Sequence, residues 1–145
     1  MKKIFCILLS VTFLIACHSS KRSTGSIREK PDPIKLAGNW QLQMLFASDN
    51  NWAKVPYINI NSAGKTFSGN SGCNSINGKF TITDNYFAFD KNIMSTKMAC
   101  VDANSNRNEK TFLSALLKIN RYTINKDELE LGQGEIVLMK FKRTD

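Results

Sequence analysis

The sequence predicts a mainly β fold with one α-helix, arranged as a small curved antiparallel sheet that approaches a barrel. Several short runs alternate between polar and apolar residues, which is typical of strands with one buried face. A single segment has the three- and four-residue apolar spacing of an amphipathic helix. Many short strands with one helix favour a curved antiparallel sheet over layers of helices. About 110 residues follow residue 35, enough for one domain with a modest core.

The predicted strands follow one another at short intervals. Residues 39–44 alternate cleanly, and residues 57–61 alternate until the turn residues 62–64. Lys126-Asp127 and Gly132-Gln133-Gly134 have the composition of turns and separate the last predicted strands. The remaining strands are predicted at 66–68, 79–83, 86–89, 121–125, 128–131 and 135–142.

The one helical pattern spans residues 108–120. Asn106 or Asn108 is the expected N-cap, because a short polar side chain there accepts from free backbone N–H groups. Glu109 is expected in the first turn, where the helix dipole favours an acidic side chain. The apolar positions that define the pattern are Phe112, Leu113, Leu116, Leu117 and Ile119.

The start of the chain reads as a lipoprotein export signal. Two lysines precede an apolar run from residue 4 to residue 15, which is the pattern of a secretory signal peptide. The run is shorter than the roughly 20 residues that a transmembrane helix needs. Leu14-Ile15-Ala16-Cys17 resembles a lipobox, which predicts a signal peptide at 1–16 and acylation of Cys17 by a diacylglyceryl group and a further chain such as palmitate. An ordinary signal peptide with a coincidental cysteine is the alternative.

Residues 17–35 are expected to form a lipid-anchored, flexible tether to the domain at 36–145. They are rich in serine, proline and charge and show no apolar periodicity. Removing Lys2 and Lys3 leaves 18 basic against 12 acidic residues, so the net charge falls from +8 to +6. We expect the protein in the bacterial cell envelope. The residue after Cys17 is His18 rather than the aspartate associated with inner-membrane retention, so the outer membrane is the expected location. Because the chain is expected to be exported, nucleic acid is a poor candidate partner.

After lipidation of Cys17, the remaining candidate pair of cysteines is Cys73 and Cys100. Two thiols in a small exported domain usually oxidise. Their bridge would close a separation of 27 residues, worth about 3–4 kcal/mol in the chain-entropy model. Two free buried thiols or half of a metal site are the alternatives. The domain has no histidine and no second pair of soft ligands, so a metal site is disfavoured and no cofactor is expected.

The stretch around Cys73 is rich in glycine and asparagine. Three of each fall between residues 69 and 78, which indicates positive φ angles, bulges or tight turns. A phosphate-binding loop is the functional alternative. The glycine spacing matches neither the P-loop nor the dinucleotide pattern, and no helix is predicted directly after it, so the backbone explanation is favoured.

The domain opens with Gly-Asn-Trp-Gln-Leu at residues 38–42, has a glycine–cysteine–asparagine motif in residues 68–74 with 78–80, and a threonine–x–methionine–alanine–cysteine segment in residues 95–100. These motifs resemble, in this order, those of the META domain family, the HslJ-like lipoproteins. Glu109 with residues 112–117 resembles the following helix, and residues 129–141 the closing hairpin. The motif positions are Gly72, Cys73, Asn74, Gly78, Thr96, Met98 and Cys100.

This resemblance implies a compact antiparallel barrel-like fold with one helix, in the bacterial envelope. Family members are associated with heat-shock response, motility or virulence, and sometimes with novobiocin resistance. The resemblance supplies no established molecular activity and no catalytic residues to transfer.

The residues favour an interaction module over an enzyme or a carrier. The single histidine, His18, lies beside the predicted anchor, so no Ser-His-Asp or Cys-His arrangement can be built in the domain. A small-ligand carrier with a lipocalin-like interior is the alternative, although a domain of this size needs most of its aromatic residues for its core. We expect an envelope protein as the partner. Trp52 is a candidate aromatic contact that could equally fold back onto the barrel.

Overall fold

The computed structural model describes residues 33–84 and 86–145. The predicted signal peptide at 1–16, Cys17 and the predicted tether as far as residue 32 lie outside the described residues. The described chain begins with a short 3-10 helix, η1 (Pro33–Leu36). Among residues 33–84 and 86–145, no helix combines the length and the apolar character needed to cross a bilayer.

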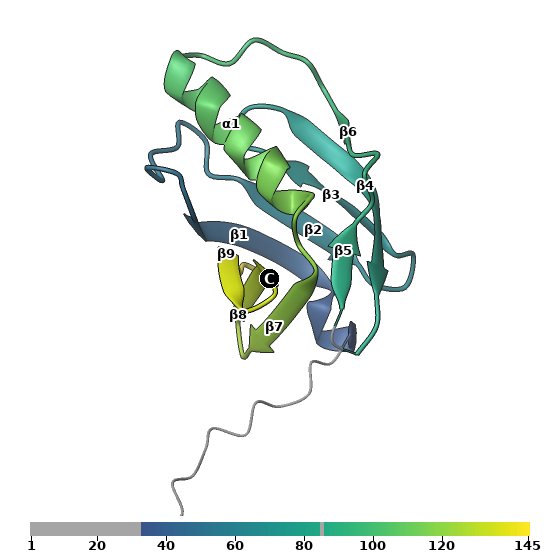
Figure 1. Ribbon diagram of the computed structural model, residues 1–145. Coiled ribbons are helices and arrows are strands. Elements are labelled where there is room, and N and C mark those ends of the chain that lie inside the picture. The colour runs from purple at the N-terminus through teal and green to yellow at the C-terminus, as the bar shows by residue number, and fades with distance from the viewer. Residues whose placement is uncertain (1–32, 85) are drawn as a thin grey trace, which may run out of the picture.

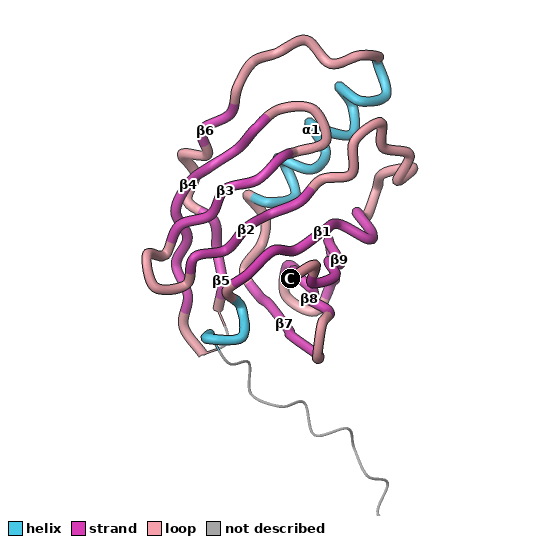
Figure 2. The backbone as a smooth tube through the Cα atoms, turned by 180° about the vertical axis from the view of Figure 1, so that it is seen from behind, coloured by secondary structure: helices cyan, strands magenta, loops and turns pink. Residues whose placement is uncertain are grey.

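A single antiparallel sheet curves into a nearly closed barrel (Figure 1), which confirms the predicted fold class. Its strand order is β5-β4-β3-β2-β1-β9-β8-β7, and β6 pairs with β4 beside β5. Figure 2, which traces the backbone as a tube, shows β4, β3, β2 and β1 as neighbouring strands on one side of the barrel. The strands are β1 (Gly38–Leu45), β2 (Tyr57–Asn61), β3 (Thr66–Asn70), β4 (Ser75–Ile82), β5 (Phe87–Phe89), β6 (Met94–Ser95), β7 (Arg121–Asn125), β8 (Glu128–Gln133) and β9 (Ile136–Arg143).

The two ends of the sheet approach each other through aromatic side chains. The ring centroids of Phe87 on β5 and Tyr122 on β7 are 6.0 Å apart. At the base, the Arg143 guanidinium lies 4.2 Å from the centre of the Trp40 ring and donates hydrogen bonds to the carbonyl oxygens of Ala37 and Lys35. These contacts hold residues 35–40 against the last strand, β9.

The interior of the barrel is filled by the chain's own side chains. Of the twelve aromatic residues of the domain that the sequence offered for the core, eight are buried, and Trp40, Phe87 and Phe112 are fully excluded from solvent. Three others, Phe46, Tyr57 and Tyr86, are exposed. Burial of apolar area is the main stabilising term for such a fold. The remaining buried aromatic residues are Phe67, Phe80, Phe89, Tyr122 and Phe141.

The helix α1 (Ala103–Leu116) begins five residues earlier than predicted. Asp102 is the N-cap, and its carboxylate accepts from the Ser105 amide at 2.9 Å, so the prediction of Asn106 or Asn108 as the cap is wrong. The first-turn placement of Glu109 is also wrong, because Glu109 lies in the middle of the helix and is buried. The apolar spacing did not predict the first turns of α1 because their buried side chains, Ser105, Asn108 and Glu109, are polar.

Most strand predictions are confirmed within two residues, but the region around β4 differs. β4 starts at Ser75 rather than residue 79, because the asparagine- and glycine-rich stretch continues a regular ladder with β3. The two-residue strand β6 was not predicted. It is too short for an alternating pattern and is defined by its pairing with Ile76 and Asn77.

Candidate functional site

A disulfide joins Cys73 to Cys100, as the sequence predicts. Their Cα atoms are 5.6 Å apart, within the range usual for a disulfide. Cys73 lies in the turn between β3 and β4, and Cys100 lies in the long connection from β6 to α1. The bridge therefore ties an otherwise irregular connection to the sheet.

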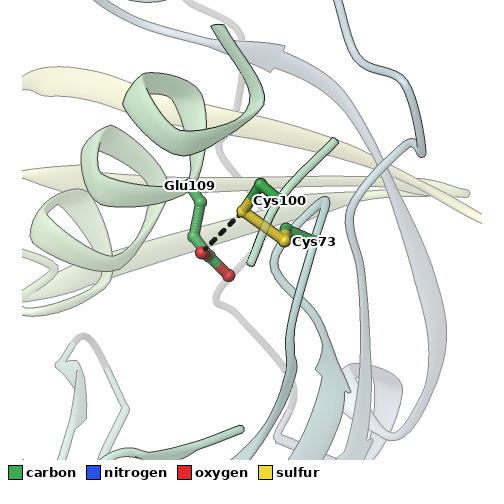
Figure 3. A group of neighbouring side chains, drawn as sticks. All are labelled: Cys73, Cys100 and Glu109. Carbon is green, nitrogen blue, oxygen red and sulfur yellow. Dashed lines mark hydrogen bonds between the residues drawn. A yellow bond between two sulfur atoms is a disulfide. The ribbon is translucent and has the colours of Figure 1, made fainter. Parts of the chain in front are cut away.

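Glu109 points from α1 toward this disulfide (Figure 3). Its Oε1 accepts from the Ser71 hydroxyl and from the Asn74 amide N at 3.0 Å, and its Oε2 accepts from Asn74 Nδ2 at 2.9 Å. Oε2 also lies 3.4 Å from Cys100 Sγ. Because a disulfide sulfur carries no hydrogen, this last contact is close packing. A buried carboxylate needs several donors, and the turn supplies three.

Asn74 connects the same turn to the β6–α1 connection. Its Oδ1 accepts from the Met98 amide and from the Thr96 hydroxyl, each at 2.8 Å. Its Nδ2 donates to Glu109 and also lies 3.3 Å from the Met98 carbonyl oxygen. Asn74 is 4% exposed, so these bonds are shielded from competing water. We call the turn 70–74, its disulfide to Cys100 and Glu109 together the latch, which holds the connection 94–102.

Two different structural requirements explain the glycines at positions 72 and 78. Gly72 has a φ of +98°, and a Cβ there would lie 2.7 Å from the Trp52 ring. Asn70 Oδ1 accepts from the Gly72 amide at 2.9 Å and closes the turn. Gly78 has no positive φ, but a Cβ at this position would lie 2.8 Å from the Phe67 ring. The predicted left-handed turn is thus found at Gly72, whereas close packing explains Gly78.

Trp52 folds back onto the barrel, which was one of the two alternatives open from the sequence. It is half-buried and meets Phe112 of α1 edge to face, with ring centroids 6.4 Å apart. Its ring also lies over Gly72. In this position it acts as packing for the latch.

The connection that the latch holds displays apolar side chains to solvent. Met94, Met98 and Val101 are 63%, 60% and 93% exposed. The backbone beneath them is fixed at several points: the Thr96 amide donates to the Ser75 carbonyl at 3.1 Å, and the Met98 amide donates to Asn74. We call residues 94–101 the presented segment.

Cys73, Cys100 and Glu109 are also the described residues whose ligand atoms come closest to a metal-binding arrangement. Their sulfur and oxygen atoms lie within 4.8 Å of one another. Both sulfurs are used in the disulfide, so neither is a thiolate that could bind a metal or attack a substrate. In this state the arrangement braces the chain.

Polar contacts also tie the loop between β1 and β2 to α1. Asn108 of α1 donates to the Asp49 carboxylate and to the Asn51 carbonyl oxygen, each at 2.9 Å. The pKa of Asp49 is lowered chiefly by the Asn108 hydrogen bond and less by Arg107. The pKa of Asp102 is lowered by hydrogen bonds from the Ser105 amide and hydroxyl. In its ionised form Asp102 therefore stabilises the start of α1, and ionised Asp49 ties the loop to the middle of the helix.

The chain belongs to the META domain family, whose model matches residues 33–145. The match begins three residues before the predicted start of the domain and includes η1. No curated protein matches the sequence.

Solved structures share the fold at low identity. One is an NMR structure of a protein from Burkholderia xenovorans, with a TM-score of 0.60, 21% identity, and coverage of 86% of this chain and 97% of that one. Another is a crystal structure of a DUF4847 family protein from Bacteroides vulgatus, with a TM-score of 0.51, 17% identity, and coverage of 75% and 95%. At these identities the likeness concerns the fold alone.

The sequence interpretation missed Asn108 and Glu109 as buried partners. A usable signal existed. Continuing the helical period backward from Phe112 and Leu116 places Ser105, Asn108 and Glu109 on the same inward stripe. Polar residues on an inward stripe require partners, and the polar turn at 70–74 supplies those of Glu109.

Proposed function

We propose that this protein is a lipid-anchored lipoprotein of the bacterial envelope and acts as a non-enzymatic interaction module that binds another envelope protein. The observation that carries the proposal is the presented segment. It holds exposed apolar side chains on a backbone fixed by a disulfide and by Asn74.

Fixing a binding segment in advance favours association. A mobile segment would lose conformational freedom on binding, whereas the latch has already restricted residues 94–101. Methionine side chains adapt to varied apolar surfaces, so Met94 and Met98 suit a recognition role. Exposed apolar groups that a fold holds in place are typical of protein contacts.

The anchor and the location rest on the sequence. The lipobox-like residues before Cys17 support acylation, and the residue that follows, His18, supports the outer membrane. A role in envelope stress or antibiotic tolerance is supported by the family resemblance. A carrier with a ligand inside the barrel has less support, because side chains such as Trp40 and Phe87 occupy the interior.

Cross-linking in the native envelope tests the interaction. A photoreactive amino acid at Val101 or Met98 should give a discrete adduct with one envelope protein. The matched control is the same amino acid at Ile136, which is 61% exposed on β9 but outside the presented segment. Equal adducts from all three positions, or none from residues 98 and 101, would contradict the proposal. The intact mass of the extracted protein reports acylation of Cys17 independently.

A further inference from the structure

A groove with an apolar floor runs between α1 and the ends of β1 and β9, outside the barrel. Its volume is about 420 Å³, within the range of about 300–1,000 Å³ usual for small-ligand sites. Phe46, Ala115 and Leu138 contribute apolar surface, and none of them belongs to the presented segment. Phe46 is 58% exposed, so a large aromatic side chain stands open at the groove.

Cations from α1 and from the turn after it line the same groove. Arg107, Lys110 and Lys118 are all exposed, and within residues 33–84 and 86–145 none of them forms an ion pair. Glu109 is the one acidic residue of α1 and faces inward. Asp49, the acid that Arg107 influences, is engaged by Asn108. Asp49 therefore offsets part of the Arg107 charge, whereas Lys110 and Lys118 form no ion pair within the described residues, and the outward side of the helix is positively charged.

The walls of the groove are fixed relative to each other. The Phe46 amide donates to the Leu138 carbonyl oxygen at 2.8 Å, which holds the end of β1 against β9. On the other side, Ser48 and Asp49 bond to Asn108 of α1. The apolar floor and the cations thus keep their spacing without a ligand, which lowers the entropic loss on binding.

We propose that this groove binds a single anionic amphiphile, with its acyl chain along Phe46, Ala115 and Leu138 and its phosphate or carboxylate head beside Arg107, Lys110 and Lys118. Apolar surface beside three exposed cations complements a molecule that has one apolar and one anionic end. Guanidinium and ammonium groups donate strong hydrogen bonds to phosphate oxygens, whereas a neutral head would leave the cations unpaired.

Titration with dodecyl phosphate below its micelle concentration, followed by amide NMR shifts, tests the proposal. The shifts should concentrate in α1 and around residues 46–47 and 138. Lys110→Glu should weaken binding about tenfold, because an attraction becomes a repulsion on an exposed position that the fold does not need. Phe46→Ser should weaken it through loss of apolar contact.

The matched control is Lys65→Glu, which makes the same charge change in the β2–β3 turn, outside the groove. It should leave the affinity unchanged. Dodecyl maltoside, with the same chain and a neutral head, should bind more weakly than dodecyl phosphate. An equal loss in Lys65→Glu would show attraction by net charge and overturn the proposal. If the protein binds anionic vesicles but does not bind monomeric dodecyl phosphate, the proposal would also be overturned, in favour of a membrane-surface contact.

Discussion

The latch and the meander of β7, β8 and β9 are held together in opposite ways. The meander is built from neighbouring strands with long ladders, which one register shift between Leu131 and Gly132 interrupts. Its surface charges pair across strands, as in Lys140 with Glu130 at 2.7 Å. The connection 94–102 has only the short strand β6 and depends on a disulfide, Asn74 and Glu109. Backbone pairing between strands that follow one another in sequence stabilises the meander. A few buried side chains that are distant in sequence stabilise the connection 94–102.

This difference teaches where single substitutions matter. Exposed ion pairs contribute little, since water and salt screen them. A buried polar group whose partner is removed loses its hydrogen bond and has no water to replace it. We therefore expect the latch to be sensitive to single changes and the meander to tolerate changes of its surface charges.

The largest effect is expected for Glu109→Ala. It removes the acceptor of the buried Asn74 backbone amide and the charged acceptor of the Ser71 hydroxyl and Asn74 Nδ2, which keep only the carbonyl oxygens of Asn74 and Met98. The loss should lower the free energy of unfolding by about 3–5 kcal/mol. Chemical denaturation measures this change. Glu128→Ala, an exposed acid of β8, is the control and should change it by less than about 0.5 kcal/mol. Similar losses in both variants would remove the distinction between the two regions.

Removing the disulfide should have the next largest effect. Replacing Cys73 and Cys100 by serine should lower the free energy of unfolding by about 3–4 kcal/mol, because the unfolded chain regains the freedom of a loop with a separation of 27 residues. Denaturation of oxidised and reduced wild-type protein provides a second measurement. No change in either comparison would mean that the polar contacts alone hold the connection.

The smallest changes in the free energy of unfolding are expected from pH. Acid should weaken the connection 94–102 through Asp102, whereas alkali should weaken the meander through Lys140. The Asp102 pKa is lowered in the fold, so its stabilisation is present above the ordinary aspartate pKa and is lost as the pH falls through the folded value. The Lys140 pKa is raised by Glu130, so its stabilisation is present below the ordinary lysine pKa and is lost as the pH rises through the folded value. Asp102→Asn keeps a capping oxygen and should flatten only the acid side of a stability profile. Flattening of the alkaline side instead would contradict this assignment.

The same contrast explains what could be predicted from the sequence. The meander was predicted within two residues because alternation and turn residues are local signals, although Gly132 and Gln133, predicted as turn, continue β8. The disulfide followed from the small number of cysteines. The start of α1 and strand β6 were missed because contacts to the 70–77 stretch, rather than their own periodicity, determine them. Trp52 could not be placed, since its packing on Phe112 and Gly72 depends on the tertiary fold.

Amide hydrogen exchange at Met98 tests the central claim most directly. Its side chain is exposed, yet its amide donates to Asn74 Oδ1, so the account predicts slow exchange in the wild-type protein. In Asn74→Ala the Met98 amide should exchange much faster, while the Leu131 amide in β8 stays protected. Exchange of Met98 in the wild-type protein at the rate of an unstructured peptide would show that the presented segment is not held, and would contradict the account.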